Sequence, residues 1–294
     1  QTMLKNIGSI ENQGYELSIE SDNLTGPFSW TTAFNISFNR NKVLELGGED
    51  YKEMAEGDGH IKTGSVRRLI AGEPIGVFYG YRFDGIFQNE EECKQQTSSA
   101  SPIGVGLRRY KDLNGDGKVD AANDREILGD ANPKFFGGLT NTFAYKGFEL
   151  NVFLQYSYGN KILNYNAMEL ENPTGGQNAY ADMVNRWTPE NPSNIYPKAT
   201  TNRAILASDR FIEDGSYLKL KTLSLSYSFP KINMKHIQGL RLYVTGQNLL
   251  TWTKYRGYDP EVSYRGASTL EAGEDFGGYP QSRTFMFGVK LDIK

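Results

Sequence analysis

The sequence has few of the residues that usually build compact catalytic or metal sites. It holds one cysteine, Cys93, and two histidines, His60 and His236. A single cysteine excludes an internal disulfide framework, and two isolated histidines in expected loops give little support to a histidine-based metal or catalytic site. The net charge of −3 and the lack of a basic cluster interleaved with aromatics give no support to nucleic-acid binding.

Long apolar runs and enzyme motifs are also missing. No stretch approaches the ~18 consecutive apolar residues of a transmembrane helix. Residues 1–4 show neither the basic nor the apolar region of a signal peptide, which suggests a piece of a longer precursor. There is no Gly-x-Ser-x-Gly elbow, no His-Glu-x-x-His motif and no nucleotide-binding loop. We therefore expect no enzymatic activity.

Aromatic residues and glycine are abundant instead, with 18 Tyr, 16 Phe and 32 Gly. The clearest pattern lies in residues 148–159, where apolar side chains take every even position and polar ones the odd positions, apart from Phe153. Because successive side chains of a strand point to opposite faces, this pattern predicts a strand with one apolar and one polar face. Its length matches the ~9–11 residues that a tilted strand needs to cross a bilayer.

Six further stretches alternate in a similar way. The run 134–145 is separated from 148–159 only by Lys146 and Gly147, which predicts a tight hairpin. The expected crossing strands are 14–21, 28–44, 134–145, 148–159, 211–229, 240–253 and 283–293. A soluble β-sandwich fits this pattern less well, because its strands usually have only ~5–6 residues.

Three local features accompany these strands. The apolar positions of 211–229 change from even to odd between Leu220 and Leu223, which predicts a β-bulge near residues 221–222. One more strand, outside the membrane, is expected at 77–87. A short helix is expected at 178–187, where apolar side chains share one face and a proline follows.

The connections between the strands alternate in length. The short ones are 22–27, 146–147 and 230–239, and the long ones are 45–133, 160–210 and 254–282. In an up-and-down meander every second connection lies on the same side, so the long loops share one end and the short turns the other. Short periplasmic turns and long extracellular loops characterise outer-membrane barrels. The sequence therefore predicts an all-β fold, an antiparallel transmembrane β-barrel with long extracellular loops.

The number of expected strands is odd. Bacterial single-chain barrels have even numbers of strands, from 8 upward, and seven strands would leave two open edges that lipid cannot satisfy. We expect the remaining strands to precede residue 1. The location predicted for the whole protein is the outer membrane of a Gram-negative bacterium, in contact with the lipid bilayer.

Several short motifs follow one another along nearly the whole chain. They are 6–8 (NIG), 12–17 (NQGYEL), 72–76 (GEPIG), 79–81 (YGY), 84–87 (DGIF), 112–117 (DLNGDG), 186–192 (RWTPENP), 214–220 (DGSYLKL) and 245–249 (TGQNL). In this order they resemble the C-terminal part of SusC/RagA-type TonB-linked outer-membrane proteins, the TonB-dependent transporters.

This resemblance implies a 22-stranded barrel closed by an N-terminal plug domain that the present chain lacks. It also implies a SusD-like surface lipoprotein as partner, and import of an oligosaccharide or a peptide driven by the TonB complex through the missing N-terminal part. Barrels of this kind often end in an aromatic residue, whereas this chain ends in Ile293-Lys294.

The sharpest local motif is the acidic stretch 112–120. Oxygen-bearing residues at positions 1, 3 and 5, glycine at 6 and a hydrophobic residue at 8 are the pattern of a Ca²⁺ loop of EF-hand type. The expected ligands are the side chains of Asp112, Asn114 and Asp116, the carbonyl of Lys118, Asp120 directly or through water, and Asp124. Asp124 lies one residue beyond the usual last ligand position. The alternative is a polar turn without a metal.

Substrate contacts are expected from aromatic side chains in the long loops. The candidates are Tyr180, Trp187, Tyr196, Tyr264 and Tyr279. The alternative for Trp187 and Tyr196 is that they pack the loop onto itself. Two other functions stay open from the sequence: a secreted calcium-binding β-domain that adheres to carbohydrate, and a barrel enzyme that uses carboxylates such as Glu213 and Asp214.

Overall fold

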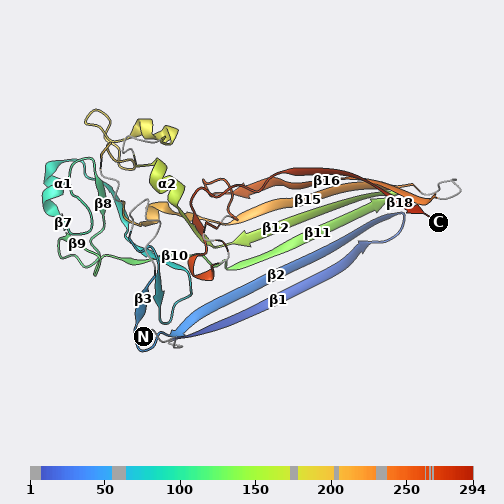
Figure 1. Ribbon diagram of the computed structural model, residues 1–294, viewed down its shortest axis with the longest axis horizontal. Coiled ribbons are helices and arrows are strands. Elements are labelled where there is room, and N and C mark those ends of the chain that lie inside the picture. The colour runs from blue at the N-terminus through green and yellow to red at the C-terminus, as the bar shows by residue number, and fades with distance from the viewer. Residues whose placement is uncertain are drawn as a thin grey trace, which may run out of the picture.

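The computed structural model describes residues 8–54, 64–172, 178–201, 205–229, 237–261, 263–264, 266 and 268–293. Antiparallel strands dominate, which confirms the predicted all-β class. Figure 1 shows an elongated molecule with one large sheet at one end and a group of small sheets, short helices and loops at the other. None of the helices in these ranges is both long and apolar enough to span a membrane.

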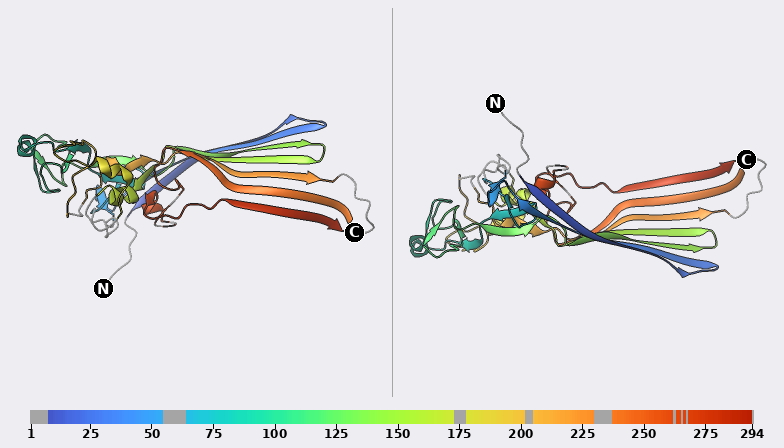
Figure 2. Two further views of the ribbon diagram at one scale, coloured as in Figure 1. Left: turned by 90° about the horizontal axis from the view of Figure 1, so that it is seen from above. Right: turned by 90° about the horizontal axis from the view of Figure 1, so that it is seen from below.

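Seven long strands form the large sheet. They are β1 (Ser9–Leu24), β2 (Phe28–Glu45), β11 (Phe135–Tyr145), β12 (Phe148–Tyr158), β15 (Tyr217–Ser228), β16 (Ile237–Thr253) and β18 (Thr284–Ile293). Each pairs with the next in chain order, so the sheet is an antiparallel meander with β1 and β18 at its edges. Figure 2 shows the strands running side by side along the long axis of the molecule.

The turn between β11 and β12 is as tight as the sequence suggested. Lys146 has φ of 45° and Gly147 has φ of 86°, and two consecutive residues with positive φ are typical of the turns that match the twist of a hairpin. This turn and the C-terminal end of β18 lie at the end of the sheet away from the small sheets (Figure 1).

The predicted bulge is present and continues into the next strand. Phe153 of β12 pairs with Thr222, whereas the adjacent Leu154 pairs with Leu220, so Lys221 is the extra residue of β15. On β16, residues 248–249 lie opposite Lys221. The bulge returns the apolar side chains of both halves of β15 to one face.

Rows of side chains across the strands separate the two faces of the sheet. One row is wholly apolar and consists of Phe34, Leu139, Leu154, Leu220 and Leu250. Another is wholly polar and consists of Thr31, Thr142, Asn151, Ser224 and Thr245. Residues opposite each other in an antiparallel pair point to the same side, so each row belongs to one face. On the apolar face the Oδ1 of Asn141 accepts hydrogen bonds from Trp30 and Thr32 at 2.9 and 2.7 Å.

The long connections gather at the other end of the sheet (Figure 1). The first contains β3 (Tyr51–Glu53), β4 (Arg68–Ile70), β5 (Val77–Gly80), β6 (Phe83–Ile86), α1 (Glu90–Gln95), β7 (Thr97–Ser98), β8 (Arg108–Tyr110), β9 (Lys118–Val119) and β10 (Glu126–Asp130). The second contains β13 (Lys161–Asn164), α2 (Tyr165–Leu170), the 3₁₀ helices Ala181–Asn185 and Asp209–Phe211, and β14 (Ile212–Asp214). The third contains the 3₁₀ helix Thr269–Glu271 and β17 (Glu274–Asp275). We name these connections loop 1, loop 2 and loop 3.

The expected strand at 77–87 is wrong as one element. It is divided into β5, which ends at Gly80, and β6, which begins at Phe83. Between them the N–H of Tyr81 donates to the carbonyl of Ala207 in loop 2 at 2.9 Å. The expected helix at 178–187 is only a 3₁₀ helix, held by bonds from Met183 to Tyr180 and from Arg186 to Met183. In both places contacts within or between the loops replace the expected regular structure.

The fifth long strand begins later than expected, at Tyr217 instead of residue 211. Residues 212–214 form β14, which pairs with β13 of loop 2. The turn between β14 and β15 is closed by Asp214, whose Oδ1 accepts from the backbone N–H and the hydroxyl of Ser216. Most of the expected turn at 230–239 lies outside the described residues. His60 and His236 also lie outside them.

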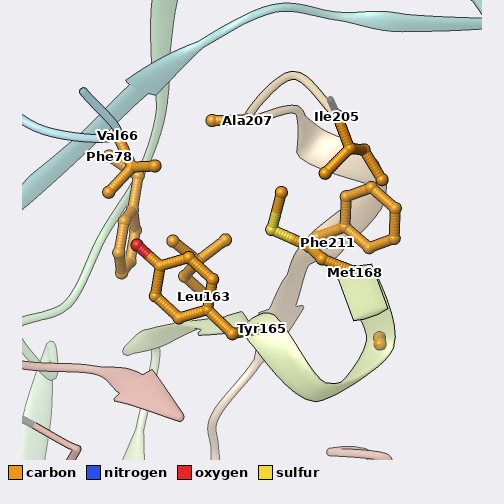
Figure 3. Close-up of a cluster of buried hydrophobic side chains, with 9 residues drawn as sticks. Val66, Phe78, Leu163, Tyr165, Met168, Ile205, Ala207 and Phe211 are labelled. Atoms are coloured by element: carbon orange, nitrogen blue, oxygen red, sulfur yellow. The ribbon is translucent and has the colours of Figure 1, made fainter. Parts of the chain in front are cut away.

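A hydrophobic core holds loop 1 and loop 2 together. Val66 and Phe78 of loop 1 pack in one cluster with residues of loop 2 (Figure 3). The members from loop 2 are Leu163, Tyr165, Ala167, Met168, Ile205, Ala207 and Phe211. Side chains on the apolar face of the sheet are much more exposed than those of this core, and Phe287 of β18 is 82% exposed. The loops are therefore a packed body carried on the end of the sheet.

Candidate functional site

The polar face of the sheet carries a buried charge cluster where loop 3 folds back over it. The ammonium of Lys219, 1% exposed, lies 2.6 Å from Asp259 and 2.5 Å from Glu261. Lys221, the bulge residue, lies 3.0 Å from Glu261. Lys219 is on the polar face because it alternates with its apolar neighbours on β15. The cluster ties loop 3 to the wall of the sheet.

The ionisation of Glu261 is governed by this cluster. Burial would raise the pKa of its carboxyl, but the hydrogen bonds and charges of Lys219 and Lys221 outweigh burial and hold that pKa below its usual value. A polar cavity of about 320 Å³ adjoins the cluster, lined in part by Asp259, Tyr258 and Arg283. The cavity opens between the sheet and loop 3.

A second buried ion pair joins loop 1 to loop 3. Arg67, 2% exposed, donates from Nε to Glu274 at 2.7 Å, although 207 residues separate the two in sequence. Its Nη1 donates to the carbonyl of Gly76 at 2.7 Å, and its guanidinium lies 4.2 Å from the centre of the Phe78 ring. Because every side of this guanidinium is occupied, Arg67 fixes loop 3 against the core of loops 1 and 2.

A third group of charges joins loop 2 to loop 3. Arg256 lies 2.7 Å from Glu171 and 2.8 Å from Glu213, and Arg210 lies 2.9 Å from Glu171. The side chain of Glu171 is 2% exposed, and a buried carboxylate requires a cationic partner, which Arg210 and Arg256 both supply. Glu213, named above as a possible enzyme carboxylate, is here an ion-pair partner.

Three of the predicted substrate-contact residues lie close together in loop 2. The indole of Trp187 donates to Gln88 at 3.0 Å, and its backbone N–H donates to the carbonyl of Tyr196 at 3.0 Å. The hydroxyl of Tyr196 donates to Asp182, and its ring stacks on Arg210. Tyr180 packs against the core of loops 1 and 2, and burial raises the pKa of its hydroxyl.

The other two candidates belong to loop 3 and are more accessible. Tyr264 is 41% exposed and its ring meets Phe276 edge to face at 5.5 Å. Tyr279 is 88% exposed. The structure thus brings Trp187, Tyr196 and Tyr180 into one region and does not gather all five into a single pocket. Substrate contact by these residues stays a prediction.

The predicted calcium loop is a tightly hydrogen-bonded turn. Both carboxylate oxygens of Asp112 accept backbone N–H groups at 2.7 Å, from Gly115 and Gly117. Asn114 and Asp116 accept N–H groups two residues ahead of them. These contacts hold residues 112–118 in a compact turn.

The C-terminal half of this loop is closed by two aspartates. Asp124 is fully buried and accepts from the N–H of Leu113 at 2.8 Å and from that of Asp120 at 2.7 Å. The Lys118 ammonium and the N–H of Asn123 hold the pKa of Asp120 below its usual value. Across the residues that the structure describes, no three His, Cys, Asp or Glu side chains converge as a metal-ligand group. Calcium binding therefore stays a prediction.

We expect Ca²⁺ to raise the melting temperature of the full-length protein and to slow hydrogen exchange in residues 112–124, because the cation would neutralise the carboxylates that line the turn. The measurement is a titration with Ca²⁺ followed by a chelator, with Mg²⁺ as the control cation. Asp116→Asn, which removes one charged oxygen, should weaken the response. An unchanged melting temperature and unchanged exchange would count against the site.

Sequence reasoning missed the ion pairs between the loops, because charged residues in irregular segments give no periodic signal. For Lys219 the sequence does predict the face of the sheet on which the side chain lies. Its position between Leu218 and Leu220 places it on the polar face of the strand. The sequence does not indicate that the partners are Asp259 and Glu261, 40 and 42 residues further on.

No protein-family model matches the chain. Curated proteins do match it: TonB-dependent receptor P3 of Formosa agariphila is 40% identical over 297 residues, which cover 99% of this chain and 29% of that protein. TonB-dependent receptor SusC of Bacteroides thetaiotaomicron is 28% identical over 99% of this chain and 27% of its own length. The chain spans less than a third of the length of the curated relatives it matches.

Solved structures show the same fold. The RagAB peptide transporter superposes with a TM-score of 0.75 at 23% identity, over 98% of this chain and 30% of that chain. The RagAB peptide importer in its "closed-closed" state gives a TM-score of 0.74 over the same share of both chains. The strands and the packed loops described above therefore occur together in another protein.

Proposed function

We propose that this chain, which belongs to the TonB-dependent receptors of the SusC/RagA type, forms part of the barrel wall and of the external loops of an outer-membrane nutrient importer. The long loops then lie outside the cell and the 146–147 turn faces the periplasm. As the chain spans about 30% of its relatives, the activity belongs to the whole receptor.

The observation that carries this proposal is the separation of the two faces of the sheet. An apolar row and a polar row each run across five strands. A membrane barrel needs an apolar outside that contacts lipid and a polar inside that contacts water. The apolar side chains of β18 are exposed, which lipid accommodates and water does not.

The edges of the sheet support the same conclusion. Within the described residues, β1 and β18 each pair with one strand only. Unpaired backbone groups are costly in lipid, so both edges require partners. We propose that the rest of the receptor supplies them and closes the barrel.

We propose that the cargo is an oligosaccharide or a peptide, that a SusD-like surface lipoprotein acts with the receptor, and that the TonB complex drives import. The similarity to SusC and to the RagAB peptide transporter supports this assignment. The exposed Tyr279 and its neighbours on loop 3 are then accessible to cargo entering the barrel.

The test uses the native host and the full-length receptor. We expect the receptor to be found in the outer-membrane fraction and to require detergent for extraction. Deletion of its gene should abolish uptake of one class of labelled oligosaccharide or peptide, and a plasmid copy should restore it. A full-length product that is soluble without detergent would contradict the proposal and favour the secreted calcium-binding domain.

A further inference from the structure

A small cavity lies between loop 1 and loop 2. Its volume is about 160 Å³. Most of its wall is apolar and is formed by Ala100, Pro102, Leu107, Tyr110, Pro197 and Leu206. A cavity of about 150 Å³ with an apolar lining holds a group of the size of benzene. The space therefore suits one aliphatic or aromatic group and not a whole oligosaccharide.

One charged residue lines this cavity. β8 alternates, so Arg108 and Tyr110 lie on its cavity side and Arg109 on the opposite side, where it pairs with Asp84 at 2.9 Å. The guanidinium of Arg108 donates from Nη2 to the carbonyl of Glu171 at 2.9 Å and lies 5.8 Å from the centre of the Phe211 ring.

The charge of Arg108 lacks a carboxylate of its own. Within the described part of the chain it makes no ion pair, and the nearby carboxylate of Glu171 is already held by Arg210 and Arg256. Burial lowers the pKa of Arg108, because the cation has lost hydrating water. A partly buried cation in an apolar wall is costly unless an anion pairs with it.

We propose that this cavity binds a small carboxylate, with the carboxylate on Arg108 and a short aliphatic body against the apolar wall. A guanidinium offers two parallel N–H donors that match the two oxygens of a carboxylate. The same chemistry is found in a free short-chain carboxylic acid and in the last residue of a peptide. The inference rests on the proposed function only in placing these loops outside the membrane.

The experiment measures binding to the purified full-length receptor in detergent by calorimetry. The probe is 4-methylpentanoate, and 4-methylpentanamide is its neutral match. We expect the carboxylate to bind at least tenfold more tightly than the amide. Galacturonate, a polar carboxylate, should bind at least tenfold more weakly than 4-methylpentanoate, because its hydroxyl groups would be buried against the apolar wall.

Two variants and one control locate the site. Arg108→Met should weaken binding of 4-methylpentanoate at least tenfold, and Ala100→Leu, which fills the cavity and keeps the charge, should do the same. Arg109→Gln removes one positive charge from the same strand outside the cavity and should leave the affinity within twofold. Should Arg108→Met fail to fold, Ala100→Leu and the carboxylate–amide pair still decide the question.

A further pair of probes distinguishes a free acid from the end of a peptide. They are Gly-Gly-Leu with a free C-terminus and Gly-Gly-Leu with an amidated C-terminus. Binding of the free peptide and not of its amide supports the site and assigns it to peptide ends; binding of 4-methylpentanoate alone supports it and assigns it to free acids. Equal affinity for 4-methylpentanoate and its amide, equal effects of Arg108→Met and Arg109→Gln, or no binding at millimolar concentration would overturn it. Calorimetry does not depend on uptake, so this failure is distinct from a failure of import.

Discussion

Replacing Lys219 with methionine is expected to lower the free energy of unfolding of the full-length receptor by about 3–5 kcal/mol, the usual cost of removing one partner of a buried ion pair. Lys219 is 1% exposed and balances Asp259 and Glu261 at 2.6 and 2.5 Å. Without it, the carboxylate of Asp259 stays buried without a cation. The measurement is denaturant-induced unfolding of the receptor refolded into lipid vesicles.

The matched control is Lys221→Met. Lys221 contacts the same Glu261, but its side chain is 29% exposed, and pairs of this kind contribute about 0–1 kcal/mol. The triple variant Lys219→Met, Asp259→Asn, Glu261→Gln removes the charges together and should recover much of the loss. Equal effects of Lys219→Met and Lys221→Met would contradict the prediction, because the buried ion pairs of Lys219 would then contribute no more than the partly exposed pair of Lys221.

The positions of the long strands follow from local information, which explains why the sequence predicts them well. A period of two is visible within a single strand, and the parity change from Leu220 to Leu223 is enough to place the bulge at Lys221. The tight turn at Lys146 and Gly147 is equally local. Strand pairing follows in the same way for β1–β2, β11–β12 and β15–β16, because short connections join these strands.

The loop assembly depends on contacts between distant residues and is not visible in the sequence. Tyr81 ends β5 because it meets Ala207 in another loop, and no property of residues 77–87 alone reveals this. Arg67 and Glu274 are 207 residues apart. The cavity beside Arg108 is formed by loop 1 and loop 2 together, so neither segment signals it. The cavity and the ion pairs between the loops could therefore be found only from the structure.

An arginine should have different effects on the apolar and the polar face of the large sheet. Leu154 lies near the middle of β12 in the apolar row, between Leu139 and Leu220. Asn151 lies three residues away in the polar row, where it donates to Thr142 at 2.9 Å. An arginine on the lipid face near the middle of a membrane costs about 2–4 kcal/mol, whereas lumen-facing positions tolerate polar and charged side chains.

Leu154→Arg is therefore expected to prevent most of the receptor from folding in the outer membrane, and Asn151→Arg, with the same new side chain on the same strand, is expected to leave folding close to normal. The most direct measurement is the fraction of folded receptor in isolated outer membranes, read from the mobility shift between unheated and heated samples on a gel. A large loss for Leu154→Arg alone supports the account of a membrane wall with one lipid face. Equal losses, or a larger loss for Asn151→Arg, would contradict it.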